Sequence, residues 1–82
     1  MGLKKLAAKV ADYNERFELG KASKIKPSHV EKVLAKLRKK SAELSADLIS
    51  AKSAEKKGRL EKKLEVAATQ IDRAEWLLEE IR

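Results

Sequence analysis

The sequence contains no cysteine, one histidine, one proline and three glycines in 82 residues. Without thiols, neither a disulfide framework nor a cysteine-based zinc site can form. A single histidine also gives little basis for a metal site, so we expect no metal and no other cofactor. Three glycines and one proline are too few to supply the turns of a small β-sandwich or barrel.

Aromatic residues are equally scarce, since Phe, Tyr and Trp each occur once, whereas Leu, Ile and Val together number 19. Such a composition predicts a core of aliphatic side chains spread along elongated elements. Charged residues make up 40% of the chain, and Ala, Leu, Glu, Lys and Arg together dominate the sequence, which is typical of long helices. At this length we expect one small helical domain over residues 1–82.

Long apolar runs are also missing, which argues against a membrane-spanning segment. The basic beginning of the chain has neither the apolar block nor the cleavage pattern of a signal peptide. The stretch "GLKKLAAKV" has only a narrow, alanine-rich apolar face, which argues against a role at the membrane surface. We therefore expect a cytoplasmic protein without a membrane partner.

A first amphipathic helix is predicted over residues 3–19. Apolar side chains recur there at spacings of three and four, which is one face of a helix: Leu3, Leu6, Val10, Tyr13 and Phe17. Gly20 is expected to end this helix, with residues 20–27 as a polar connector. The capping box "DYNE" at residues 12–15 offers an alternative, later start.

The second helix is predicted over residues 29–52. Pro27 disfavours a helical conformation at Lys26, and Ser28 with Glu31 forms a capping-box pattern that predicts Ser28 as the N-cap. From there the heptad positions are filled by Val30, Leu34, Leu37, Ser41, Leu44, Leu48 and Ala51.

The third helix is predicted over residues 57–81, with a stripe made by Leu60, Leu64, Ala67, Ile71, Ala74, Leu78 and Ile81. At about 100° per residue this stripe is displaced by roughly a third of a turn from the second one. One continuous helix would therefore carry two separate apolar faces, so we expect a turn at residues 53–58. Either Gly58 ends a helix there or Ser53 caps a new one. The predicted fold is all-α: an antiparallel, coiled-coil-like helical hairpin with an additional N-terminal amphipathic helix.

Trp76 lies nearly opposite the third stripe on an ideal helix. One interpretation is that the first helix folds back and covers it with Tyr13 or Phe17, because aromatic pairs stabilise such contacts. The other interpretation is that Trp76 anchors a second copy or a partner protein, since Trp is enriched at the centres of interfaces. The predicted partner-binding residues are Trp76, Leu77, Val66, Tyr13 and Phe17.

Catalytic patterns are lacking. His29 and Ser28 are adjacent at a helix start, where a solvated histidine and a capping serine explain both residues. None of the six serines stands in a nucleophile elbow, and no two glycines are close enough to build a phosphate loop. We expect a protein that is not an enzyme.

The formal net charge is +7, with 20 basic and 13 acidic residues. The excess concentrates in "KLRKK" at residues 36–40, in the connector, and around the predicted hairpin turn. A solvated helix surface explains such lysines, but a basic hairpin end can also lie along a phosphate backbone. The candidate nucleic-acid contacts are Lys36, Arg38, Lys39, Lys40, Lys52, Lys56, Lys57, Arg59, Lys62 and Lys63.

These observations favour a non-enzymatic protein-interaction or scaffolding module that works through apolar helix faces. Its expected partner is a second copy of the chain or another helical protein. The alternative is that the protein binds nucleic acid through the hairpin tip and the 36–40 cluster. Such binding would be independent of sequence, because lysines outnumber arginines 15 to five and lack the forked guanidinium that makes paired hydrogen bonds to bases.

Overall fold

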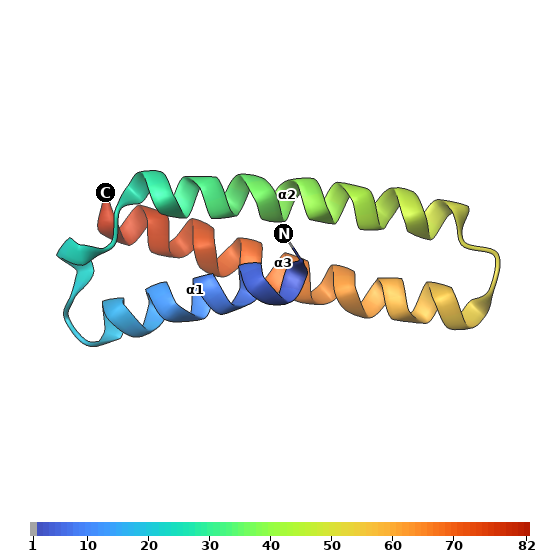
Figure 1. The fold of residues 1–82 in the computed structure, drawn as a ribbon, viewed down its shortest axis with the longest axis horizontal. Helices are drawn as coiled ribbons and strands as arrows, with labels where there is room; N and C mark the ends of the chain where they lie inside the picture. The colour runs from blue at the N-terminus through green and yellow to red at the C-terminus, as the bar shows by residue number, and fades with distance from the viewer. Residues whose placement is uncertain (1) are drawn as a thin grey trace.

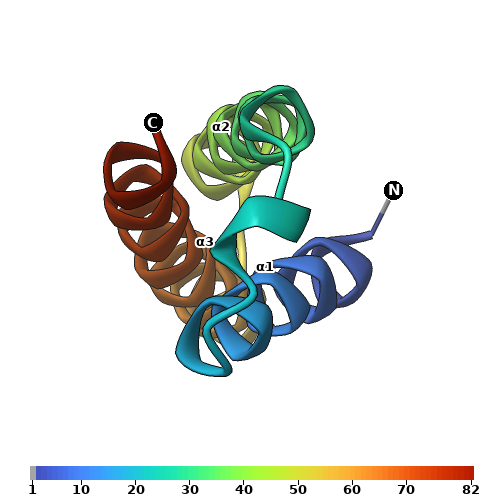
Figure 2. The ribbon, with the colours of Figure 1, turned by 90° about the vertical axis from the view of Figure 1, so that its left-hand side faces the viewer.

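The computed structural model describes residues 2–82, which form helices joined by short connections (Figure 1). The elements are α1 (Leu3–Glu18), the short 3-10 helix η1 (Ala22–Lys24), α2 (Pro27–Ser50) and α3 (Ala54–Ile81). Helices α2 and α3 pack side by side as an antiparallel hairpin, and α1 folds back along one half of it (Figures 1 and 2). The prediction of an all-α hairpin with an additional N-terminal helix is confirmed. The molecule is elongated, with extents of 47 × 18 × 18 Å.

The chain reverses direction between α2 and α3 within three residues, 51–53. Ser53 adopts an extended conformation, and its Oγ accepts a hydrogen bond of 3.1 Å from the backbone N–H of Lys56. Ser53 is therefore the N-cap of α3, as one of the two predictions held. The other was wrong, because Gly58 lies inside α3 without a positive φ. A satisfied cap at Ser53 starts the helix at Ala54 rather than at residue 57.

The predicted N-cap of α2 was wrong. The helix begins at Pro27, Lys26 occupies the N-cap position with φ −84° and ψ 124°, and no side chain caps this end. Proline has no N–H to satisfy and its fixed φ suits the first helical position, so it starts the helix before Ser28. At the other end α2 stops at Ser50, two residues earlier than predicted.

Gly20 ends the first helix, as predicted. Its φ of +75° is left-handed, and its N–H donates to the carbonyl of Phe17 at 3.1 Å. The next N–H, of Lys21, donates to the carbonyl of Arg16 at 2.8 Å. These bonds satisfy carbonyls that a helix end leaves without partners. Because α1 begins at Leu3, the alternative start at "DYNE" was wrong.

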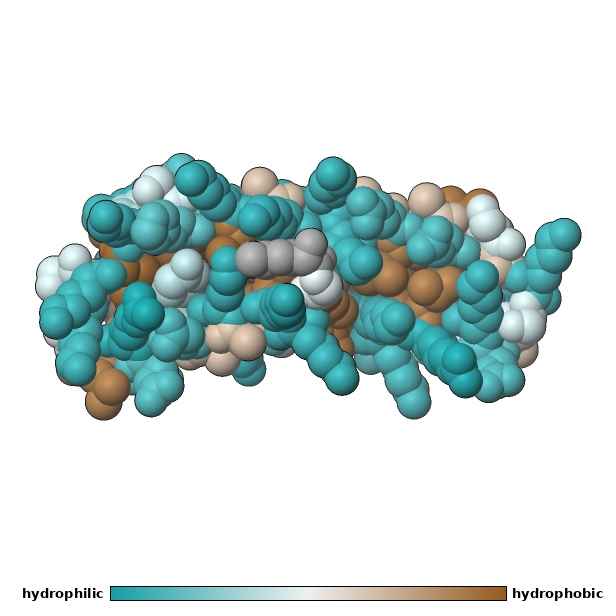
Figure 3. All heavy atoms as spheres, in the orientation of Figure 1, coloured by the Kyte–Doolittle hydropathy of each residue, from teal (hydrophilic) through white to brown (hydrophobic). Residues whose placement is uncertain are grey.

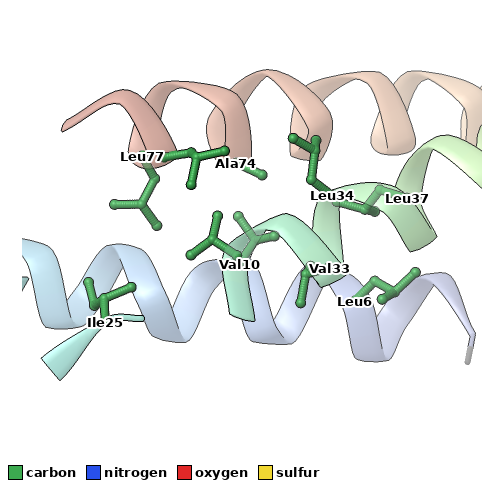
Figure 4. Packing of buried hydrophobic residues seen from close by; sticks show 10 residues of the cluster. Leu6, Val10, Ile25, Val33, Leu34, Leu37, Ala74 and Leu77 are labelled. Atoms are coloured by element: carbon green, nitrogen blue, oxygen red, sulfur yellow. The ribbon is translucent and has the colours of Figure 1, made fainter. Parts of the chain in front are cut away.

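The main core lies where all three helices meet. It is formed by Leu6, Val10, Ile25, Val30, Val33, Leu34, Leu37, Ala74, Leu77 and Leu78. Polar side chains cover most of the face seen in Figure 3, while Figure 4 shows Leu6 and Val10 of α1 facing side chains of α2 and α3. The predicted polar connector contributes Ile25 to this core, only 3% exposed, because η1 turns that side chain inward.

Two ion pairs define the register of the hairpin. Arg82 donates to Glu31 at 2.8 Å, and Arg38 lies 3.4 Å from Glu75. Glu31 and Arg38 are seven residues apart at α2, and Glu75 and Arg82 are seven residues apart at the end of α3. Both pairs therefore belong to the same antiparallel register. Towards the turn, a second and smaller cluster packs Leu44, Ala51 and Leu60 between only two helices.

Candidate partner-binding groove and basic face

The first helix is too short to cover the hairpin. With 16 residues α1 is about 24 Å long, whereas the 24 residues of α2 and 28 of α3 give about 36 and 42 Å. The N-terminal end of α1 lies near the middle of the hairpin (Figure 1). The turn-side half of the hairpin (residues 40–66) therefore continues as two helices without a third.

An apolar groove with a volume of about 610 Å³ opens beside the N-terminal end of α1. Its floor includes Leu44 of α2 and Leu60 of α3, which belong to the smaller hydrophobic cluster. Val66, 44% exposed, forms part of one wall. Figure 3 shows hydrophobic side chains lying between the helices in this half of the molecule. The groove is lined by Gly2, Leu3, Lys4, Ala7, Lys40, Leu44, Asp47, Leu60, Lys63 and Val66.

The rim of the apolar groove is basic. Lys4, Lys40 and Lys63 come from three different helices, and Asp47 is the one acidic residue among the groove residues. Lys40 also lies 4.0 Å from Glu43, which points to the neighbouring surface. The groove thus combines an apolar floor with an excess of positive charge at its edge.

Trp76 meets the first helix through Phe17. Their ring centroids are 5.3 Å apart at an interplanar angle of 80°, an edge-to-face arrangement. The interpretation that α1 folds back onto Trp76 is therefore confirmed for Phe17. Trp76 nevertheless remains 50% exposed, because one aromatic edge covers only part of the indole.

The other predicted partner-binding residues do not gather around Trp76. Leu77 is 0% exposed and belongs to the core, so it is not part of the surface. Tyr13 packs partly buried against the same core, with the Arg16 guanidinium 5.8 Å from its ring centroid. Val66 lies ten residues before Trp76, about 15 Å along α3, and lines the apolar groove instead.

The structure divides the predicted 36–40 cluster between two surfaces. Lys36, Lys39 and Lys40 line one hollow together with Glu43. Arg38 points towards α3, where it pairs with Glu75. The helical period accounts for this division, since residues two apart in sequence project about 200° from one another.

The predicted basic residues around the turn are exposed, and one of them, Arg59, is held in an ion pair. Arg59 donates to Glu55 at 2.8 Å, one helical turn before it, and Lys63 belongs to the groove rim. The remaining lysines of the predicted tip are all exposed: Lys52, Lys56, Lys57 and Lys62.

A second hollow lies between α1 and α2, and the sequence did not point to it. It is lined by Lys9 and Tyr13 from α1 and by His29, Lys32, Val33 and Lys36 from α2. Lys36 is shared with the hollow of Lys39 and Lys40, so the two are contiguous. We call Lys9, His29, Lys32, Lys36, Lys39 and Lys40 the basic face. Lys9 and Lys32 are 23 residues apart, so only the packing of α1 on α2 reveals their proximity.

No protein-family model, curated protein or solved structure matches the chain. Within residues 2–82, none of the helices combines the length and the apolarity needed to cross a lipid bilayer.

Proposed function

We propose that the protein is a non-enzymatic interaction module that binds an amphipathic helix of a partner protein in the apolar groove. The observation that carries the proposal is that α1 covers only one half of the hairpin and leaves an open groove beside it, where Val66 is 44% exposed and Leu44 and Leu60 line the interior at 4% and 8% exposure. A bound helix would continue the path of α1 and complete three-helix packing along the turn-side half. Helix-in-groove recognition of this kind relies on apolar anchors repeated every three or four residues.

The rim supports a partner helix with acidic flanks. Three lysines against one aspartate surround the groove, so carboxylates beside the apolar stripe of a partner would meet opposite charge. Rim charges of this kind chiefly set association rate and specificity, while the apolar contacts supply affinity. We therefore infer a partner helix with Leu, Ile or Val on one face and Glu or Asp beside it.

A second copy of the chain fits this groove less well. Each copy carries a net charge of +7, and two basic rims brought together would repel one another. Analytical ultracentrifugation distinguishes binding of a partner protein from binding of a second copy of the chain. A dimer that Val66→Asp abolishes would assign the groove to self-association and contradict the choice of a partner protein.

Binding rather than catalysis is supported by the interior of the molecule. Within residues 2–82 every fully buried side chain is apolar. Catalytic acids, bases and nucleophiles usually work where burial and neighbouring charges alter their reactivity. The described part of the chain offers its ionisable groups to solvent instead, and its hollows lie open on the surface.

Calorimetric titration with two designed helical peptides tests the proposal. Both peptides carry the same leucine stripe over about 14 residues, long enough to fill about 21 Å of groove. One has glutamates beside the stripe and the other has lysines. We expect the glutamate peptide to bind and the lysine peptide to bind at least about 10-fold more weakly, because three rim pairs at about 0.5 kcal/mol each approach a factor of ten.

Two surface substitutions provide the matched controls. Val66 at 44% exposure lines the groove, whereas Ile49 at 87% exposure does not. Val66→Asp should abolish peptide binding and Ile49→Asp should leave it unchanged, with the helical circular dichroism of both variants intact. Failure of both peptides to bind, or loss of binding only in Ile49→Asp, would contradict the proposed groove.

A further inference from the structure

We propose a second binding site: the basic face between α1 and α2 holds the phosphate backbone of duplex nucleic acid without reading its sequence. This site shares only Lys40 with the rim of the proposed helix-binding groove, and the inference does not rest on that groove. It differs from a basic hairpin tip, because the residues that converge extend from the middle of α2 towards its N-terminal end, away from the turn. Lys9 of α1 and Lys32 of α2 line the same hollow.

The lysines of the basic face come from two helices, one from α1 and a row of four from α2. Lys9 projects from α1, while Lys32, Lys36, Lys39 and Lys40 follow one side of α2. From Lys32 to Lys40 the row extends about 12 Å along the helix axis. Over that distance a duplex presents about seven phosphate charges, counting both strands at one per about 1.7 Å. About half of these lie on each strand, so the four lysines of the row are about as closely spaced as the phosphates of one strand.

Most of these lysines have no acidic partner. Within residues 2–82, Lys40 alone among them forms an ion pair, the 4.0 Å contact with Glu43. Glu31 and Glu75 form ion pairs with arginines between α2 and α3. The positive charge of the basic face is thus concentrated on one surface of the bundle and available to an anionic ligand.

The aromatic and apolar content of this face favours a duplex over a single strand or a membrane. Tyr13, the aromatic residue of the hollow, is partly buried and has Arg16 over its ring, so it offers no free platform for an unpaired base. None of the exposed large hydrophobic residues, Leu19, Ile49, Val66 and Trp76, lines either hollow, so nothing is placed to insert into lipid. Lysine charge on its own recognises backbone phosphate.

Fluorescence anisotropy with a labelled 20-base-pair duplex of arbitrary sequence tests the proposal. If about four phosphates are neutralised, affinity should fall by about two orders of magnitude between 50 and 200 mM salt. Replacing Lys9, Lys32 and Lys36 by Gln should lower the logarithmic salt slope by about three, close to one unit for each phosphate that is no longer neutralised. Two unrelated sequences should bind within about threefold of each other, because phosphate contacts carry no base information.

The matched control removes the same charge at the turn, through Lys52→Gln, Lys57→Gln and Lys62→Gln. All six lysines are exposed, so both triple variants should retain the fold. The proposal requires the turn variant to keep most of the salt slope. Equal losses in the two variants would show attraction by net charge alone, and a larger loss in the turn variant would place the site at the tip.

Further results would overturn the proposal outright: no duplex binding at 50 mM salt, tighter binding of a 20-nucleotide single strand, or binding only to vesicles containing phosphatidylserine. The groove variant Val66→Ser should bind duplex like the native chain, since it adds no charge beside Lys40 and Val66 is not part of the basic face. This keeps the outcome separate from that of the peptide titration.

Discussion

The rings of Phe17 and Trp76 meet edge to face with their centroids 5.3 Å apart, and this contact joins the first helix of the chain to the last. Phe17 is the next-to-last residue of α1, and Trp76 lies in the last third of α3. The pair helps to fix α1 on the half of the hairpin opposite the turn. That position leaves the turn-side half without a third helix.

Loss of the aromatic contact should loosen α1. We expect Phe17→Leu to make Trp76 fluorescence more accessible to acrylamide, since the indole is already half exposed and loses its one aromatic neighbour. A double-mutant cycle with Trp76→Leu should give a coupling of about 0.5–1.5 kcal/mol in urea unfolding. Leu19→Ala, at an exposed position in the same region, serves as the control. A coupling near zero would show that the two rings contribute independently.

Two glycines should respond to alanine with opposite signs. A Cβ added at Gly20 or at Gly58 meets no atom within 4 Å, so space does not distinguish them. Gly20 has a φ of +75°, where alanine costs about 1 kcal/mol of folding free energy. Gly58 is inside α3, where alanine should stabilise the protein by about 0.5–1 kcal/mol. Thermal unfolding of the two variants measures both effects, and stabilisation by Gly20→Ala would contradict the assigned helix end.

The two serines considered as caps should also differ. Ser53→Ala removes the 3.1 Å hydrogen bond to Lys56 and should cost about 1 kcal/mol. Ser28→Ala removes no cap, because α2 begins at Pro27, and should change stability by less than about 0.5 kcal/mol. Urea denaturation of both variants tests the assignment. A larger cost at Ser28 would restore it as the N-cap of α2.

The architecture was predictable from the sequence because it follows from helical periodicity. The phase shift between the stripes ending at Ala51 and starting at Leu60 requires a turn, whichever residue makes it. The exact turn was not predictable, since Gly58 can end a helix or sit within one. In the structure the side-chain hydrogen bond of Ser53 fixes the start of α3, and a sequence pattern does not show such a bond.

The candidate sites were predictable only in part. Val66 was expected at a partner surface and does line a groove, whereas Leu77, its counterpart in that prediction, is buried. The apolar stripe of the first predicted helix is shorter than the stripes of the other two. This difference was the sequence signal that one half of the hairpin would lie uncovered. The basic face had no such signal, because Lys9 and Lys32 come together only when α1 packs on α2.

Gln70 carries a buried side-chain oxygen without a hydrogen-bond partner among the described residues. Replacing Gln70 by Met keeps the length of the side chain and removes the unsatisfied amide. We expect Gln70→Met to stabilise the fold by about 1 kcal/mol, measured by urea unfolding, because the desolvation cost of the amide disappears. Destabilisation of similar size would show that the amide is satisfied in solution.

The most direct test of the account is a methyl NMR titration of the leucine- and valine-labelled protein with the glutamate-flanked helical peptide. The apolar groove predicts that the methyl signals of Leu44, Leu60 and Val66 shift on binding. The signals of Leu34, Leu37 and Leu77, which lie in the core beneath α1, should stay in place. Shifts confined to the core leucines, or no shifts at saturating peptide, would contradict the claim that the uncovered half of the hairpin receives a partner helix.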